Sequence, residues 1–154
     1  MSVRAWRITM AEHAPVAFTG EGAASFGGRW NSVGVPVVYV AGSAALAALE
    51  LLVHLELEDL YEEFVLFEVG FEESLVEAVG IEKFPRNWQS ELPEPELQQI
   101  GDEWAASARS VVLRVPSAII DDDWNYLLNP LHREFRKIKL GKPRKFRFDS
   151  RLIK

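Results

Sequence analysis

The chain has 154 residues, of which 48% are hydrophobic, enough for one globular domain with a single core. It contains no cysteine, which excludes disulfides and thiolate metal sites, and its three histidines are too widely spaced to indicate a metal centre. The net charge is −6, no apolar run reaches the ~20 residues that span a bilayer, and the first residues do not resemble a signal peptide, so we expect a cytoplasmic protein without a membrane partner.

The first half of the chain predicts two strands and one helix. Val3–Ile8 is a short apolar strand, and a glycine-rich loop follows over Thr19–Gly34. The β-branched run Pro36–Val40 predicts a buried strand. Ser43 is a good N-cap for a helix over Ala44–Leu55, which is rich in alanine and leucine.

The second half is less regular. Phe64–Val69 predicts a strand, Glu94–Ser107 a helix, and Ser110–Val115 a further strand that ends at Pro116. The stretch Asp121–Pro130 is interpreted as turn-rich, with its asparagines in structural roles. Strands and helices do not alternate regularly, so the sequence predicts one α+β domain over residues 1–154 with mixed or antiparallel sheets and flanking helices.

The C-terminal segment is strongly basic. Residues 133–154 contain ten lysines and arginines against two acidic residues, whereas the rest of the chain is acidic. Such a split is typical of a polyanion-binding tail. Apolar residues alternate with the charges, however, so we predict a helical turn over Leu131–Arg136 and folded strands over Lys137–Leu140 and Lys145–Phe148.

Glu50 is the first candidate for chemistry. It is the only acidic residue between Ser43 and Leu55, and helical spacing places it on a stripe with Leu46 and Val53. A carboxylate on an apolar stripe is costly to bury unless it is paired or used. The alternative is that Glu50 lies at the edge of the stripe and reaches water or an arginine.

A second candidate is the run Gly27-Gly28-Arg29-Trp30-Asn31. Two glycines allow close approach of a ligand to the backbone, and the guanidinium of Arg29 suits phosphate oxygens. Trp30 and Asn31 can stack on a ligand and hydrogen-bond to it. The alternative is an ordinary turn with a packed tryptophan, and neither a P-loop nor a dinucleotide fingerprint is present.

Tyr39 and Ser117 complete the candidates, because each lies where a predicted strand ends. Tyr39 can present its ring to a base or serve as a core residue with a satisfied hydroxyl. Ser117 follows Pro116 and can face a site or cap a turn. No Ser–His–Asp arrangement is evident from the spacing.

Together these segments resemble the RES domain family, which is named after an arginine, a glutamate and a serine. The matching residues are Arg29 within Gly27–Asn31, Glu50 after Ala47-Ala48-Leu49, and Ser117 after Pro116. Flanking segments also match, namely Trp6-Arg7-Ile8, Gly20-Glu21-Gly22-Ala23 and Asn125-Tyr126-Leu127-Leu128-Asn129-Pro130. The resemblance extends from about residue 4 to residue 152, although residues 72–107 contain no recognisable family motif.

The resemblance implies an ADP-ribosyltransferase-like fold and a toxin that degrades NAD. NAD is then the substrate, inorganic phosphate a possible co-substrate, and no prosthetic group is expected. Catalytic roles would belong to Glu50, Arg29 and Ser117, and substrate contacts to Arg29, Tyr39, Ser117, Trp30 and Asn31. The implied partner is an antitoxin with an Xre-type helix-turn-helix domain, and the toxin itself is expected to form a homodimer or a higher complex.

Three other functions remain open from the sequence. The toxin can transfer ADP-ribose to a protein instead of to phosphate or water. It can be a non-enzymatic nucleic-acid-binding module that uses the basic segment 133–154, although the acidic remainder and the pI near 5.1 disfavour direct nucleic-acid binding. It can also be a structural interaction protein without activity.

Overall fold

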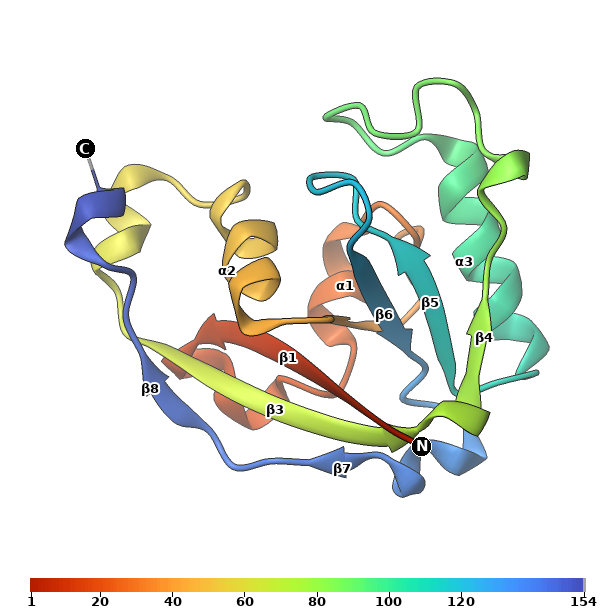
Figure 1. Cartoon of the computed structure of the whole chain (residues 1–154), viewed down its shortest axis with the longest axis horizontal. Coiled ribbons are helices and arrows are strands. Elements are labelled where there is room, and N and C mark those ends of the chain that lie inside the picture. The colour runs from red at the N-terminus through yellow and green to blue at the C-terminus, as the bar shows by residue number, and fades with distance from the viewer. Residues whose placement is uncertain (154) are drawn as a thin grey trace.

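The computed structural model describes residues 1–153, which form a mixed eight-stranded sheet (Figure 1). The strands are β1 Ser2–Met10, β2 Val38–Ala41, β3 Phe64–Glu72, β4 Val76–Ala78, β5 Val112–Pro116, β6 Trp124–Leu128, β7 Lys139–Leu140 and β8 Arg144–Phe146. Their order is β4-β5-β6-β2-β1-β3-β7, and β8 also pairs with β3. Only β4 and β5 are parallel among these strand pairs, so the predicted α+β class with a mixed sheet is confirmed.

Three α-helices accompany the described sheet: α1 Glu21–Phe26, α2 Ala44–Leu52 and α3 Pro95–Ser107. The predicted N-cap of α2 is confirmed, because Ser43 Oγ accepts a hydrogen bond from the Leu46 amide at 3.0 Å. In Figure 1, α3 lies beside β4 and β5, while α2 lies in the half of the molecule that contains the C-terminus. Within residues 1–153, no helix has the length and apolar composition that a membrane crossing requires.

The stretch Thr19–Gly34 was predicted to be a glycine-rich loop. That prediction was wrong for part of it, because residues Glu21–Phe26 form α1. Gly20 has φ 78° before the helix, and Gly27 has φ 73° after it and donates to the Ala23 carbonyl at 2.8 Å. Glycine adopts such positive φ values without strain, whereas other residues rarely do. The glycines therefore delimit a helix built from the residues between them.

The prediction that Asp121–Pro130 is turn-rich was wrong for half of that stretch. Residues Trp124–Leu128 form β6, which pairs with β5 on one side and β2 on the other. Asparagine favours turns in isolation, but two flanking strands supply all the backbone partners that an internal strand needs. The non-local pairing therefore overrides the local preference.

The basic C-terminal segment is folded, as its alternation indicated. A 3₁₀ turn covers Arg133–Lys137, and β7 and β8 then lie along the outer edge of β3. Phe146 and Phe148 pack edge to face with ring centroids 5.1 Å apart, which anchors the end of the chain. Most of the basic side chains are exposed on this edge.

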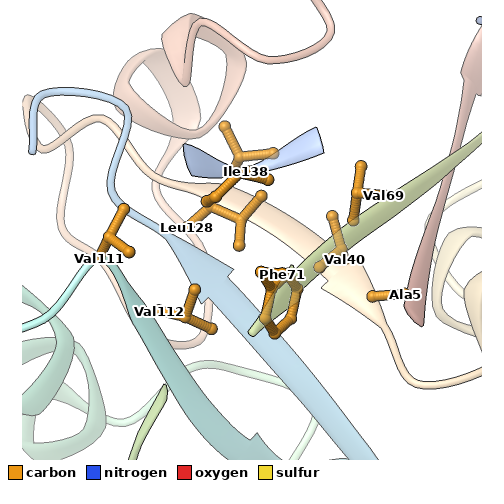
Figure 2. Close-up of a cluster of buried hydrophobic side chains, with 9 residues drawn as sticks. Ala5, Val40, Val69, Phe71, Val111, Val112, Leu128 and Ile138 are labelled. Atoms are coloured by element: carbon orange, nitrogen blue, oxygen red, sulfur yellow. The ribbon is translucent and has the colours of Figure 1, made fainter. Parts of the chain in front are cut away.

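The core consists of three adjoining clusters. Figure 2 shows the first, in which side chains from β1, β2, β3, β5 and β6 meet Val111 and Ile138. The second lies under α2 and includes Leu46, Ala47, Phe64 and Phe148. The third packs α3 against the sheet and is centred on Trp104. The second cluster thus fixes α2, the helix that carries Glu50.

We predict that Gly101→Ala destabilises the fold. A Cβ at Gly101, within α3, would lie 1.7 Å from the Trp30 carbonyl oxygen, so the helix would have to move away from the Arg29–Trp30 segment. We expect a loss of about 1–3 kcal/mol in the free energy of unfolding, measured by chemical denaturation. Gly22→Ala is the matched control, because nothing lies within 4 Å of its Cβ. Equal stability of the two variants would contradict this close packing.

Candidate active site

A cavity of about 530 Å³ opens between α1, α2 and the strands β1, β2 and β6. This volume lies within the ~300–1,000 Å³ range of small-molecule sites. Two arginines, two carboxylates and several aromatic rings line it: Arg7, Arg29, Glu50, Glu91, Trp6, Phe26, Trp30 and Tyr39. Glu91 is exposed on the loop before α3, so Glu50 is the carboxylate that the fold holds in place.

Glu50 projects from α2 into this cavity and is partly buried. Its Oε1 accepts hydrogen bonds from Ser117 Oγ and from Asn125 Nδ2, each at 2.8 Å. Both donors come from the other side of the cavity, from the end of β5 and from β6. In the part of the chain that the structure describes, these bonds leave Oε2 without a protein donor, so one oxygen is fixed and the other is available to a ligand.

Ser117 lies behind Glu50. Its side chain is 1% exposed, and the cavity wall is formed instead by its neighbours Pro116 and Ala118. Its Oγ accepts from the amides of Ile119 and Ile120, both at 3.1 Å, and donates to Glu50. The structure thus brings the expected arginine, glutamate and serine to one region, with the serine supporting the glutamate.

Tyr39 contributes to the wall of the cavity, but its hydroxyl is engaged inside the protein. It donates to Asn31 Oδ1 at 2.6 Å and accepts from the Trp30 amide at 3.1 Å. Burial raises the pKa of this hydroxyl above its usual value. A Cβ at Gly28 would lie 2.7 Å from the Tyr39 hydroxyl, so this position requires glycine.

Trp30 and Asn31 are also almost completely buried, at 2% and 0% exposure. Trp30 borders the cavity and packs against Phe84, with ring centroids 5.3 Å apart. Asn31 lies outside the cavity lining and donates through Nδ2 to the carbonyls of Ala23 and Val35. Trp30 therefore contributes shape, and Asn31 holds the segment that presents Arg29.

Arg29 joins the cavity to the loop of residues 85–93. Its two terminal nitrogens donate to the carbonyls of Trp88 at 2.7 Å and Ser90 at 2.8 Å. Burial lowers the pKa of Arg29, and the nearby carboxylate of Glu50 opposes this shift. A guanidinium has five N–H donors, so Arg29 can hold this loop and still offer donors to an anion.

We predict that Arg29→Ala loosens the loop of residues 85–93. Loss of two charge-assisted hydrogen bonds should speed hydrogen exchange at the amides of Trp88 and Ser90 by about tenfold or more. Arg86→Ala is the matched control, because Arg86 is exposed on the same loop. Identical exchange in the two variants would contradict this role of Arg29.

The cavity is also lined by polar residues that the sequence analysis did not propose, among them Arg7 and Asn125. Arg7, on β1, donates to the Tyr39 carbonyl at 3.1 Å, while its buried Nε has no partner among residues 1–153. Burial lowers the pKa of Arg7 to about 10. The sequence feature that could have pointed to Arg7 is its place within a predicted apolar strand. Asn125 was missed because its strand was interpreted as a turn.

Nowhere in residues 1–153 do three or more His, Asp or Glu side chains gather closely enough to hold a metal ion.

Known proteins resemble this chain over nearly its whole length. A protein named "Toxin Res" from Photorhabdus laumondii is 38% identical over 150 residues, which cover 97% of this chain and 96% of that protein. A protein named "Prs ADP-ribosylating toxin" from Sphingobium sp. is 36% identical over 159 residues, which cover 100% of this chain and 99% of that protein. A chain of the M. tuberculosis MbcT–MbcA toxin–antitoxin complex superposes with a TM-score of 0.67 at 18% identity, covering 96% of this chain and 85% of that one.

The chain is a small α+β domain with the fold of that toxin–antitoxin complex chain, and its pocket contains one carboxylate that the fold holds in place. The RES domain family model matches residues 4–149. The chain belongs to the RES domain family, as its arginine, glutamate and serine motifs indicated.

Proposed function

We propose that this chain is the toxin of a toxin–antitoxin pair and that it cleaves the nicotinamide–ribose bond of NAD. The observation that carries the proposal is the carboxylate of Glu50, fixed by Ser117 and Asn125 at a cavity that also contains Arg7 and Arg29. The names of the relatives support the toxin assignment.

The charges of the cavity suit a dinucleotide of this kind. NAD has two phosphate groups, for which Arg7 and Arg29 provide guanidiniums. The nicotinamide ring carries the positive charge, and its ribose develops positive charge as the bond breaks. Glu50 is the anion that stabilises this charge. The rings of Trp6 and Phe26 offer apolar surface to the bases.

One fixed carboxylate is sufficient for this reaction. Most glycosidases need a second carboxyl group to protonate an alkoxide leaving group. Nicotinamide instead takes the electron pair of the C1′–N bond and departs neutral. An acceptor oxygen then forms the new bond to C1′ and releases its proton. Glu50 acts by electrostatic stabilisation and by binding a ribose hydroxyl through Oε2, and Ser117 positions it.

The acceptor is phosphate or water in this proposal. Arg29 has donors available for inorganic phosphate as well as for NAD. The test is to incubate the purified protein with NAD, with and without phosphate, and to follow nicotinamide and the ADP-ribose product by mass spectrometry. Phosphate-dependent loss of NAD indicates a phosphorylase and phosphate-independent loss a glycohydrolase, while intact NAD in both reactions contradicts the proposal.

Transfer of ADP-ribose to a protein is the second candidate function. It is favoured by the relative named "Prs ADP-ribosylating toxin". Phe26, 86% exposed, and Leu92, 78% exposed, also offer apolar surface near the cavity to a protein substrate. Incubation of the toxin with labelled NAD and cell lysate distinguishes the two, because label bound to a protein supports the transferase.

The proposed partner is an antitoxin with an Xre-type helix-turn-helix domain. The MbcT–MbcA complex supports an antitoxin partner, since one chain of that toxin–antitoxin pair has the same fold as this chain. Co-expression of this chain with the product of a neighbouring gene should relieve growth inhibition and yield a stable complex. Continued toxicity without complex formation would contradict that assignment.

A further inference from the structure

Asn125 has a buried acceptor that the protein does not use. It lies on β6 and lines the cavity beside Glu50. Its Nδ2 donates to Glu50 Oε1 at 2.8 Å, whereas its Oδ1 is buried and has no partner among the described residues. Buried side-chain acceptors are nearly always hydrogen-bonded, so an exception at the wall of a cavity points to a donor on the ligand.

The orientation of this amide follows from its neighbour. A carboxylate only accepts hydrogen bonds, so the atom of Asn125 that faces Glu50 must be the nitrogen. The unused atom is therefore the oxygen, and the ligand group next to it must be a donor. A ligand carboxylate at this position would be unfavourable, because it would face two other hydrogen-bond acceptors, Asn125 Oδ1 and the carboxylate of Glu50.

We propose that Asn125 Oδ1 accepts a hydrogen bond from the carboxamide N–H of nicotinamide, which makes Asn125 a specificity-determining residue for the amide form of the dinucleotide. This inference rests on the proposed NAD cleavage. The nicotinamide ring adjoins the ribose carbon beside Glu50, so its substituent lies within reach of a residue that contacts Glu50. The ribose hydroxyls are served by Glu50 Oε2, and the carboxamide is the remaining donor nearby.

The matching non-substrate is nicotinic acid adenine dinucleotide. It has a carboxylate in place of the carboxamide and is otherwise identical. A site that pairs with a donor rejects an analogue that lacks it, because the buried acceptor is then left unpaired. We expect kcat/KM for NAD to exceed that for nicotinic acid adenine dinucleotide by more than about 100-fold.

The test compares this ratio in wild type, Asn125→Ala and Ser117→Ala. Each variant removes one hydrogen bond to Glu50 Oε1, but only Asn125 also lines the cavity. We expect the ratio to fall at least about tenfold in Asn125→Ala and to stay unchanged in Ser117→Ala, even where both variants lose activity. If Asn125→Ala does not fold, Asn125→Thr suits the strand and lacks the carbonyl.

Other outcomes would overturn the inference. An equal loss of activity with both dinucleotides in Asn125→Ala would mean that Asn125 only positions Glu50 or contacts a ribose hydroxyl. If wild type cleaves neither dinucleotide, the proposed function fails, and binding of free nicotinamide and nicotinic acid, measured by NMR titration, decides the inference. Preference for nicotinamide that Asn125→Ala abolishes supports it, and equal binding of both compounds overturns it.

Discussion

Glu50→Gln is expected to lower kcat for NAD cleavage by about 1,000-fold or more while the domain stays folded. Removal of one electrostatic contact to a transition state already costs about 100- to 1,000-fold, and here the full negative charge opposite the developing cation is lost. Glutamine can keep its oxygen toward Ser117 and Asn125, so both hydrogen bonds of the present arrangement survive. The measurement is nicotinamide release under single-turnover conditions.

The control for this substitution is Glu58→Gln. Glu58 is exposed in the 3₁₀ turn Leu57–Tyr61 and does not line the cavity, so its loss removes one negative charge without touching the site. Near wild-type turnover in Glu50→Gln, with a folded protein and a normal thermal transition, would remove Glu50 from the mechanism.

Arg7→Met is expected to make the free protein more stable and its binding of NAD weaker. Burial lowers the pKa of Arg7 well below its usual value, to about 10, so folding disfavours the charged form. One pKa unit corresponds to about 1.4 kcal/mol, and removal of the guanidinium should therefore recover up to about 3 kcal/mol at neutral pH. A ligand phosphate would lose one charge-assisted hydrogen-bonding partner, which is expected to weaken binding by about 10- to 100-fold.

The pH dependence gives a further check on Arg7. The penalty is fully present below about pH 10, where the side chain is charged in both the folded and the unfolded protein, and it fades as the pH rises from about 10 towards the usual pKa of arginine. The gain in Tm of the variant should therefore be largest at neutral pH and shrink in alkaline buffer. Calorimetry of unfolding tests the gain in stability, and calorimetry of NAD binding tests the loss of affinity. A variant that binds NAD as tightly as wild type would contradict the assignment of Arg7 to phosphate binding.

The elements that could be predicted from the sequence are those whose local pattern agrees with their place in the fold. Helix α2 has a serine cap and an unbroken run of good helix formers, and β3 is a mostly apolar run rich in phenylalanine and valine. Helix α1 and β6 were missed for opposite reasons. The first is a short helix hidden between glycines, and the second has turn-forming residues that two neighbouring strands hold extended.

The site residues also divide into those that local sequence motifs predict and those that only the fold identifies. Arg29, Glu50 and Ser117 were proposed from their motifs, and the fold brings all three to the cavity region. The sequence could not show that Ser117 lies behind Glu50, because that depends on how the end of β5 meets α2. Arg7 and Asn125 face the cavity from strands whose exposed and buried sides only the sheet pairing defines.

The last residues of the chain complete the packing beneath Glu50. Phe148 is buried in the cluster under α2, and Phe146 and Ile153 pack against it, so a nascent chain that still holds these residues within the ribosome lacks part of the platform for its carboxylate. The cavity-lining residues themselves lie between positions 6 and 125 and are synthesised earlier. In terms of biosynthesis, the residues that line the pocket are translated before those that complete its support, so α2 gains its full platform only after residues 146–153 have left the ribosome.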